Sequence, residues 1–199
     1  MFIKIIPLCY IIVETKYIIM KTKIKVKLIG NTMPLEIIPK GDWIDLRARE
    51  TVTLKAPEAT MLKRDRKAGQ PEGEGRRKVV YDTALINLGV AMELPAGFEA
   101  WVEPRSSTPS KVKIELRNSK GIIDNSYNGD ADEWKFGARA TEDTTIEAGT
   151  RIAQFRIALS QKATAWQKIK WLFSNGIEIV YVNSLNNKNR GGIGTTGIK

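Results

Sequence analysis

Short stretches in which polar and apolar residues alternate constrain the fold of this chain more than any other feature. In MKTKIKVKL, residues 20–28, lysine alternates with Ile24, Val26 and Leu28. Successive side chains of a strand point to opposite faces, so the pattern predicts a strand with one face toward a core. We therefore expect the folded domain to begin at Met20.

The same alternation recurs as far as residue 159. It is found in VKIEL, residues 112–116, and in TRIAQFRIAL, residues 150–159. The second stretch places Phe155 on the core face and Gln154 on the opposite face. Many short strands at this spacing predict an all-β fold, either an antiparallel barrel or a jelly-roll sandwich.

One short helix is predicted at about residues 161–174. Trp166, Ile169 and Phe173 recur there at steps of three and four residues. We expect this apolar stripe to face the core. IEIVYV, residues 177–182, then predicts a final strand.

The length of 199 residues suits one domain, which we expect at residues 20–185. Residues 1–19 are an apolar extension that we expect to lie outside the fold. Their uncharged run, residues 5–13, is too short for a membrane span of roughly twenty residues, and no signal-peptide cleavage site follows. We expect a cytoplasmic protein without a membrane partner, and a flexible glycine-rich arm at residues 186–199.

Composition excludes several kinds of chemistry. The chain has no histidine and one cysteine, which removes histidine-based zinc sites, Ser-His-Asp triads and internal disulfides. Carboxylates, hydroxyls or an oxygen-bound cation such as Mg²⁺ remain. The net charge of +10 favours a polyanionic ligand. Residues 63–78 hold much of that charge and are typical of a solvated loop, although a polyanion or protein partner stays open there.

Residues 121–130, GIIDNSYNGD, allow two interpretations. Asn128-Gly129 is typical of a hairpin turn, in which Asp124 would have no special role. Alternatively, the backbone at the edge of such a hairpin could bind a planar ring, with the Asp124 carboxylate beside it for proton transfer. On this stretch alone we favour the plain turn.

Two further stretches suit an anion. EPRSSTPSK, residues 103–111, places Arg105 beside hydroxyl residues, and arginine can clamp a phosphate through its planar fork. RGGIGTTGIK, residues 190–199, has the composition of an anion-binding loop. An ordinary polar turn and a frayed terminus would look similar. Together the three stretches favour nucleotide binding.

The order of these motifs resembles the trimeric, all-β deoxyuridine triphosphatases (dUTPases) over roughly residues 21–197. Five stretches carry the resemblance: KGDWIDLRA at 40–48, PRSST at 104–108, GIIDNSYNG at 121–129, GTRIAQ at 149–154 and RGGIGTTG at 190–197. The resemblance implies a distorted jelly-roll barrel, a homotrimer with active sites between subunits, and hydrolysis of dUTP to dUMP and pyrophosphate with Mg²⁺.

The resemblance also implies roles for the third-motif residues. Asp124 would be the general base that activates a water for attack at the α-phosphorus. Tyr127 would stack beneath the deoxyribose and exclude a 2′-hydroxyl. Asn118 would read the uracil edge together with backbone at Gly121 and Ile123.

The other motifs would bind the triphosphate and its ion. Arg105, Ser106 and Ser107 would contact phosphate, Gln154 would bind phosphate or the attacking water, and Asp45 would help hold Mg²⁺ through water. The arm would close with its own set of residues, namely Arg190, Gly192, Ile193, Gly194, Thr195 and Thr196.

Two features depart from the family. Only Trp43 and Ile44 separate Asp42 from Asp45, so the local turn must differ. Ile193 stands where the family usually has a phenylalanine over the uracil, which predicts weaker closure unless another aromatic residue, for which Trp134 is the candidate, covers the base.

Three alternatives stay open. A dCTP deaminase has the same fold, and a regulatory protein would keep the nucleotide site but act on a partner. A nucleic-acid-binding β-domain would need an interleaved strip of aromatic and basic residues, so specific nucleic-acid binding is not expected.

Overall fold

The computed structural model describes residues 20–37, 39–62 and 76–192 of the chain, and it is built mostly of strands. The strands are β1 (Met20–Leu28), β2 (Ile44–Arg47), β3 (Val52–Leu54), β4 (Glu58–Leu62), β5 (Arg76–Val80), β6 (Thr83–Asn87), β7 (Val90–Glu93), β8 (Phe98–Pro104), β9 (Ile114–Leu116), β10 (Gly121–Ile123), β11 (Lys135–Ala140), β12 (Thr144–Ile146), β13 (Arg151–Leu159) and β14 (Ser174–Tyr181). The helical segments are the π-helical turn η2 (Thr108–Val112) and the α-helix α1 (Ala165–Leu172).

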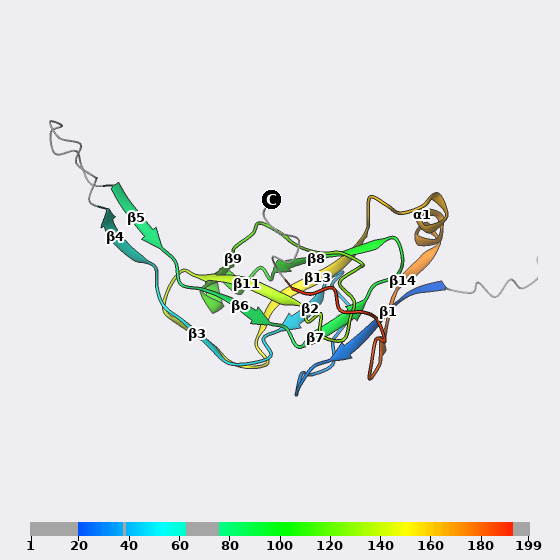
Figure 1. Ribbon diagram of the computed structural model, residues 1–199, viewed down its shortest axis with the longest axis horizontal. Coiled ribbons are helices and arrows are strands. Elements are labelled where there is room, and N and C mark those ends of the chain that lie inside the picture. The colour runs from blue at the N-terminus through cyan, green and yellow to red at the C-terminus, as the bar shows by residue number, and fades with distance from the viewer. Residues whose placement is uncertain (1–19, 38, 63–75, 193–199) are drawn as a thin grey trace, which may run out of the picture.

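All of these strands except β4 and β5 form small sheets around one core (Figure 1). The largest has the order β10-β8-β13-β2, and two others have the orders β14-β1-β7 and β6-β11-β9. Two-stranded pairs, β12-β3 and β4-β5, complete the pairing of the described strands. The prediction of an all-β fold with one short helix is confirmed.

Alternation places the strand faces as the sequence predicts. In β1, Ile24 and Val26 are buried whereas Lys23 and Lys25 are exposed. In β13, Phe155 is fully buried and its neighbour Gln154 is only partly so. The hydrophobic effect therefore sets which face of each strand turns inward.

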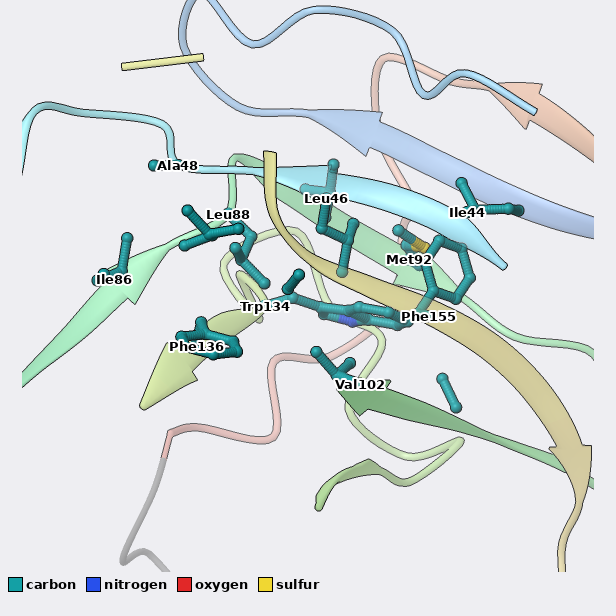
Figure 2. Packing of buried hydrophobic residues seen from close by; sticks show 14 of the residues in the cluster. Ile44, Leu46, Ala48, Ile86, Leu88, Met92, Val102, Trp134, Phe136 and Phe155 are labelled. Carbon is teal, nitrogen blue, oxygen red and sulfur yellow. The ribbon is translucent and has the colours of Figure 1, made fainter. Parts of the chain in front are cut away.

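The core is centred on two aromatic rings, that of Trp134 in the loop before β11 and that of Phe155 in β13. Trp134 and Phe155 meet edge to face with their ring centroids 5.2 Å apart, and both side chains are fully buried. Figure 2 shows Leu46, Met92 and Val102 packed around them. One apolar cluster thus joins segments from Ile24 to Ile157.

The predicted hairpin at Asn128-Gly129 is wrong. β10 pairs with β8, whereas the next strand, β11, pairs with β6 and β9 in a different sheet. Gly129 instead opens a turn, because Asp132 N–H donates to Gly129 O (3.1 Å) and Gly129 N–H donates to Asp132 Oδ2 (2.9 Å). A side-chain acceptor inside the turn directs the chain away from hairpin geometry.

The predicted orientation of the late helix is also wrong. The helix begins after an N-cap at Thr164, whose capping box with Gln167 is complete. Its supposed core stripe is exposed, since Trp166 is 63% and Phe173 78% exposed. Trp171 contacts the core instead, with its ring 5.0 Å from that of Phe98.

β4 and β5 form a two-stranded ribbon that extends away from the rest of the molecule (Figure 1). The end of the predicted basic loop, residues 76–78, belongs to β5, and residues 63–75 lie outside the described residues. Within the described ranges, neither helix is long and apolar enough to cross a membrane.

Removing the buried Phe155 ring should show how much it contributes to the stability of the core. We expect Phe155→Ala to lower the free energy of unfolding by about 3–5 kcal/mol, because it leaves a cavity beside Trp134. The matched variant Phe173→Ala removes an exposed ring and should change it by less than about 0.5 kcal/mol. Urea unfolding followed by tryptophan fluorescence measures both, and equal losses would contradict this core assignment.

Candidate active site

The sheet β10-β8-β13-β2 carries residues from four of the five motifs. Asp45 lies in β2 and Gln154 in β13, while Arg105 directly follows β8 and Asp124 directly follows β10. Motifs that are far apart in the chain therefore lie on adjacent strands of one sheet.

Asp45 holds two arginines in place at one end of this sheet. Its side chain is only 6% exposed, and its Oδ1 lies 2.8 Å from Arg105 Nε while its Oδ2 lies 3.0 Å from Arg151 Nη1. A buried carboxylate requires such compensation. The pairing orients the Arg105 guanidinium, which is itself partly exposed at the sheet end.

The turn after β8 is built on Thr108, a residue that motif reading assigned no role. Its buried hydroxyl donates to Ile152 O (2.9 Å) and accepts from Arg105 N–H (3.2 Å). Ser106 is exposed and Ser107 partly so. The threonine thus ties the arginine-serine turn to β13 and leaves both serine side chains on the accessible side. The signal available in the sequence was a threonine directly before Pro109, four residues after Pro104.

Gln154 adjoins this turn. Its Nε2 donates to Pro104 O (3.2 Å), and its backbone lies opposite Asp45 on one side and Glu103 on the other. Asp45, Arg105 and Gln154 consequently lie close together, with Asp45 paired to Arg105 and Gln154 bonded to the residue before Arg105.

Third-motif residues form a second group. Asp124 is 58% exposed, and its Oδ2 lies 2.8 Å from Arg190 Nη1 of the fifth motif. Tyr127 N–H donates to Asp124 O (3.0 Å), and the Tyr127 hydroxyl donates to Glu133 O (2.9 Å). Burial, with the charges of Asp132 and Glu133, raises the pKa of the Tyr127 phenol, so it stays a proton donor at neutral pH.

The residues expected to bind the uracil edge lie in β10 or just before it. Asn118 is exposed, and its Nδ2 donates to Lys120 O (3.2 Å). Gly121 lies so close to β8 that an added Cβ would stand 3.1 Å from Val102 O. Ile123 is half-buried opposite Ala100.

One chain does not bring the two groups together. Ile123, next to Asp124, pairs with Ala100 near the start of β8, whereas Arg105 follows the end of that strand. Five residues of extended strand span about 17 Å, so Asp124 and Arg105 lie at opposite ends of β8.

The fifth motif is described only in its first residues. Arg190 and Gly192 are placed, while Ile193, Gly194, Thr195 and Thr196 lie outside the described residues. Arg190 and Gly191 both donate backbone N–H groups to Asp132. The flexible arm predicted from residue 186 stays a prediction, and its first residues are hydrogen-bonded to the body of the protein.

Trp134 does not cover a base. Its side chain is fully buried, and its Nε1 has no hydrogen-bond partner in the described structure. The prediction that this ring could replace the missing phenylalanine is therefore wrong: its apolar ring is drawn into the core.

Among the described residues, no three His, Cys, Asp or Glu side chains gather to hold a metal ion. Both oxygens of Asp45 already contact guanidinium groups. This donor set does not fit direct coordination of Mg²⁺. It fits an ion that is bound mainly by its ligand's phosphates and contacts protein through water.

Comparison with known proteins identifies the family. The dUTPase family model matches residues 78–170. The SPbeta prophage-derived deoxyuridine 5'-triphosphate nucleotidohydrolase of Bacillus subtilis is 39% identical over 178 residues, covering 89% of this chain and 99% of the relative. This chain belongs to the dUTPase family.

Other dUTPases agree. A deoxyuridine 5'-triphosphate nucleotidohydrolase of Hydrogenobaculum is 33% identical over 60% of this chain and 74% of its own length. The crystal structure of the Streptococcus mutans dUTPase superposes with a TM-score of 0.52 at 18% identity, over 71% of this chain and 99% of that one. These matches confirm a dUTPase fold for the described strands.

The pairing of Asp45 with Arg105 and Arg151 should contribute to stability. We expect Asp45→Asn to lower the free energy of unfolding by about 1–3 kcal/mol, because two neighbouring guanidinium groups lose their shared counter-charge. Water screens part of this attraction, because the Arg105 and Arg151 side chains are 26% and 37% exposed.

Asp42→Asn is the matched control. Asp42 is 75% exposed and lies 3.3 Å from Arg156, so its loss should cost less than about 0.5 kcal/mol. Chemical unfolding of both variants measures the difference, and an Asp45→Asn protein as stable as the parent would contradict the buried pairing.

Proposed function

We propose that this chain hydrolyses dUTP to dUMP and pyrophosphate, at sites formed between subunits of a homotrimer in the cytoplasm of a bacterium or a phage-infected host. Its near full-length similarity to a relative named as a deoxyuridine triphosphate nucleotidohydrolase supports the reaction. The separation of Asp124 from Arg105 along β8 is the observation that supports a site shared between subunits. A second subunit can supply the missing half of each site.

The Arg105 end would bind the triphosphate. Its guanidinium is oriented by Asp45 and is partly exposed, which suits charge-assisted hydrogen bonds to phosphate oxygens. Ser106 and Ser107 would donate to adjacent oxygens, with Ser106 near the bond that breaks. Gln154 would bind phosphate or the attacking water through its amide.

Asp124 would act as the general base. Its exposed carboxylate would take a proton from a water as the water oxygen attacks the α-phosphorus and pyrophosphate leaves. Neither Asp45 nor Asp132 suits this role, because each is buried and accepts from several donors. Of these three carboxylates, that of Asp124 is the one accessible to water.

Tyr127 would select the sugar. Its ring is held at one end by the bond from its hydroxyl to Glu133 O and is packed against the core. A ring that cannot move aside rejects a 2′-hydroxyl by steric exclusion, which supports discrimination against UTP.

Uracil would be read at β10. Asn118 would present its amide to the base edge, and the backbone at Gly121 and Ile123 would complete the hydrogen bonds. The absence of a side chain at Gly121, where β10 approaches β8 closely, supports this role.

The arm would close over the bound nucleotide through residues 190–196. The Arg190 guanidinium contacts Asp124 in this chain, and a triphosphate would compete for it. Gly192, Ile193, Gly194, Thr195 and Thr196 would then contact the phosphates and base. Ile193 would supply aliphatic contact where an aromatic ring is usual.

Mg²⁺ would be held mainly by the three phosphates, with Asp45 contacting it through water. When bound, the ion would neutralise charge on the departing pyrophosphate. The guanidinium contacts of Asp45 make direct coordination by this carboxylate unfavourable.

A substrate comparison tests the reaction. We expect pyrophosphate release from dUTP in the presence of Mg²⁺, at least about 100-fold faster than from UTP, dTTP or dCTP, because wrong substrates clash or leave polar groups unpaired. Omitting Mg²⁺ should abolish most of the release. Conversion of dCTP to dUTP would indicate a deaminase instead, and nucleotide binding without turnover would indicate a regulatory protein.

Subunit complementation tests the shared site. Asp124→Asn and Arg105→Gln should each lower kcat by about 100-fold or more on their own. If these groups come from different subunits, random mixing of the two variants in closed trimers restores about a quarter of the sites.

The control is a mixture of Asp124→Asn with Asp124→Ala, which cannot rebuild an intact site. Recovery only in the first mixture supports a site between subunits. No recovery in co-refolded trimers would show that both groups act within one chain.

A further inference from the structure

We propose that Asp132 is a positioning residue that fixes the starting point of the C-terminal arm relative to the catalytic segment. The proposal rests on the proposed function. Asp132 belongs to GDADEW, a stretch that none of the five motifs includes beyond its first glycine.

Asp132 binds backbone from two parts of the chain. Its side chain is 1% exposed, and its Oδ2 accepts from Gly129 N–H at 2.9 Å and from Arg190 N–H at 2.8 Å. Its Oδ1 accepts from Gly191 N–H at 3.1 Å. One buried carboxylate therefore joins the turn after β10 to the first residues of the arm. Charge-assisted bonds of this kind are stronger than neutral ones.

The two backbones also touch directly. A Cβ added to Gly129 would lie 2.5 Å from Asn189 Cα and 2.7 Å from Asn189 N, so only glycine permits this approach. Asn189 Oδ1 accepts from Ala131 N–H at 2.8 Å. Shape and hydrogen bonding thus place the arm at the same point.

The chain leading to the arm is held in the same manner. Asp130 accepts from the Ser184 hydroxyl at 2.6 Å and from Leu185 N–H at 2.8 Å, and these bonds lower the pKa of its carboxyl. It therefore stays ionised at neutral pH. Asn187 Nδ2 donates to Glu93 at 2.9 Å. The chain is accordingly bonded to the body from Ser184 to the contacts of Asp132 with Arg190 and Gly191.

This arrangement links the third and fifth motifs. Asp124 and Tyr127 lie a few residues before Asp132, and Arg190 reaches back to Asp124 at 2.8 Å. An arm whose origin is fixed loses less conformational entropy when it closes over a nucleotide. Asp132 should therefore lower KM without contacting substrate.

Asp132→Asn tests the anchor because an amide nitrogen cannot accept a backbone N–H. We expect amide hydrogen exchange at Arg190 and Gly191 to become about tenfold faster or more. The KM for dUTP should rise about tenfold, with kcat within about a factor of two of the parent. The control is Asp143→Asn, which makes the same substitution in another loop at a carboxylate that accepts from Ala56 N–H at 2.7 Å through one oxygen, a bond that the amide oxygen can keep.

Gly129→Ala tests the same point without changing charge. The new methyl group should displace Asn189, and exchange and KM should change as in Asp132→Asn while the core unfolds at the same urea concentration. If Asp132→Asn does not fold, hydrogen exchange and KM of Gly129→Ala decide the question.

Unchanged exchange at residues 190 and 191 in both variants would overturn the anchor. Faster exchange with an unchanged KM for dUTP would overturn the proposal that the Asp132 anchor assists substrate binding. If the parent protein lacked dUTP turnover, the proposed function would fail on its own, and hydrogen exchange would still decide whether Asp132 holds the arm.

Discussion

The pairing of β8 with β13 is the constraint on which the other features of this molecule depend. It runs in register from Ala153 opposite Pro104 to Leu159 opposite Phe98. One face of β13 supplies Phe155 to the core, and the other presents Gln154 beside the end of β8. Because β8 is bordered by β10 on its other side, the two ends of a single strand place the two halves of the proposed dUTPase site.

Three aspartates in or near the proposed site differ in what surrounds them. Asp45 is enclosed by guanidinium groups and Asp132 by backbone N–H groups, so both buried charges are compensated. Asp124 is mostly exposed and meets only Arg190 among the ion pairs of the described residues. Burial with full compensation favours a structural role, whereas an accessible carboxylate can exchange its partner for water or substrate. The difference in solvent exposure thus accounts for the different roles proposed for these three carboxylates.

Local patterns failed where a distant partner decided the outcome. Asn128-Gly129 is a strong hairpin signal, but the Asp132 carboxylate captures Gly129 N–H and the flanking strands join different sheets. The helical stripe of Trp166, Ile169 and Phe173 has the right spacing for a core face, yet Trp171 is the α1 ring that packs against Phe98 at the start of β8. Periodicity predicts that a face is apolar, and the packing of other elements decides which face is covered.

The sequence by itself determined the all-β class, the inward faces of β1 and β13, the exclusion of histidine chemistry and the identity of the motif residues, because these depend on residue type and on a period of two. Only the tertiary structure decided that Asp45 holds Arg105 and Arg151, that Thr108 ties the arginine-serine turn to β13, and that Asp132 receives the arm. It also separated Asp124 from Arg105 along one strand. Strand order and the partners of buried polar groups arise from contacts between segments distant in the chain, and no local pattern encodes them.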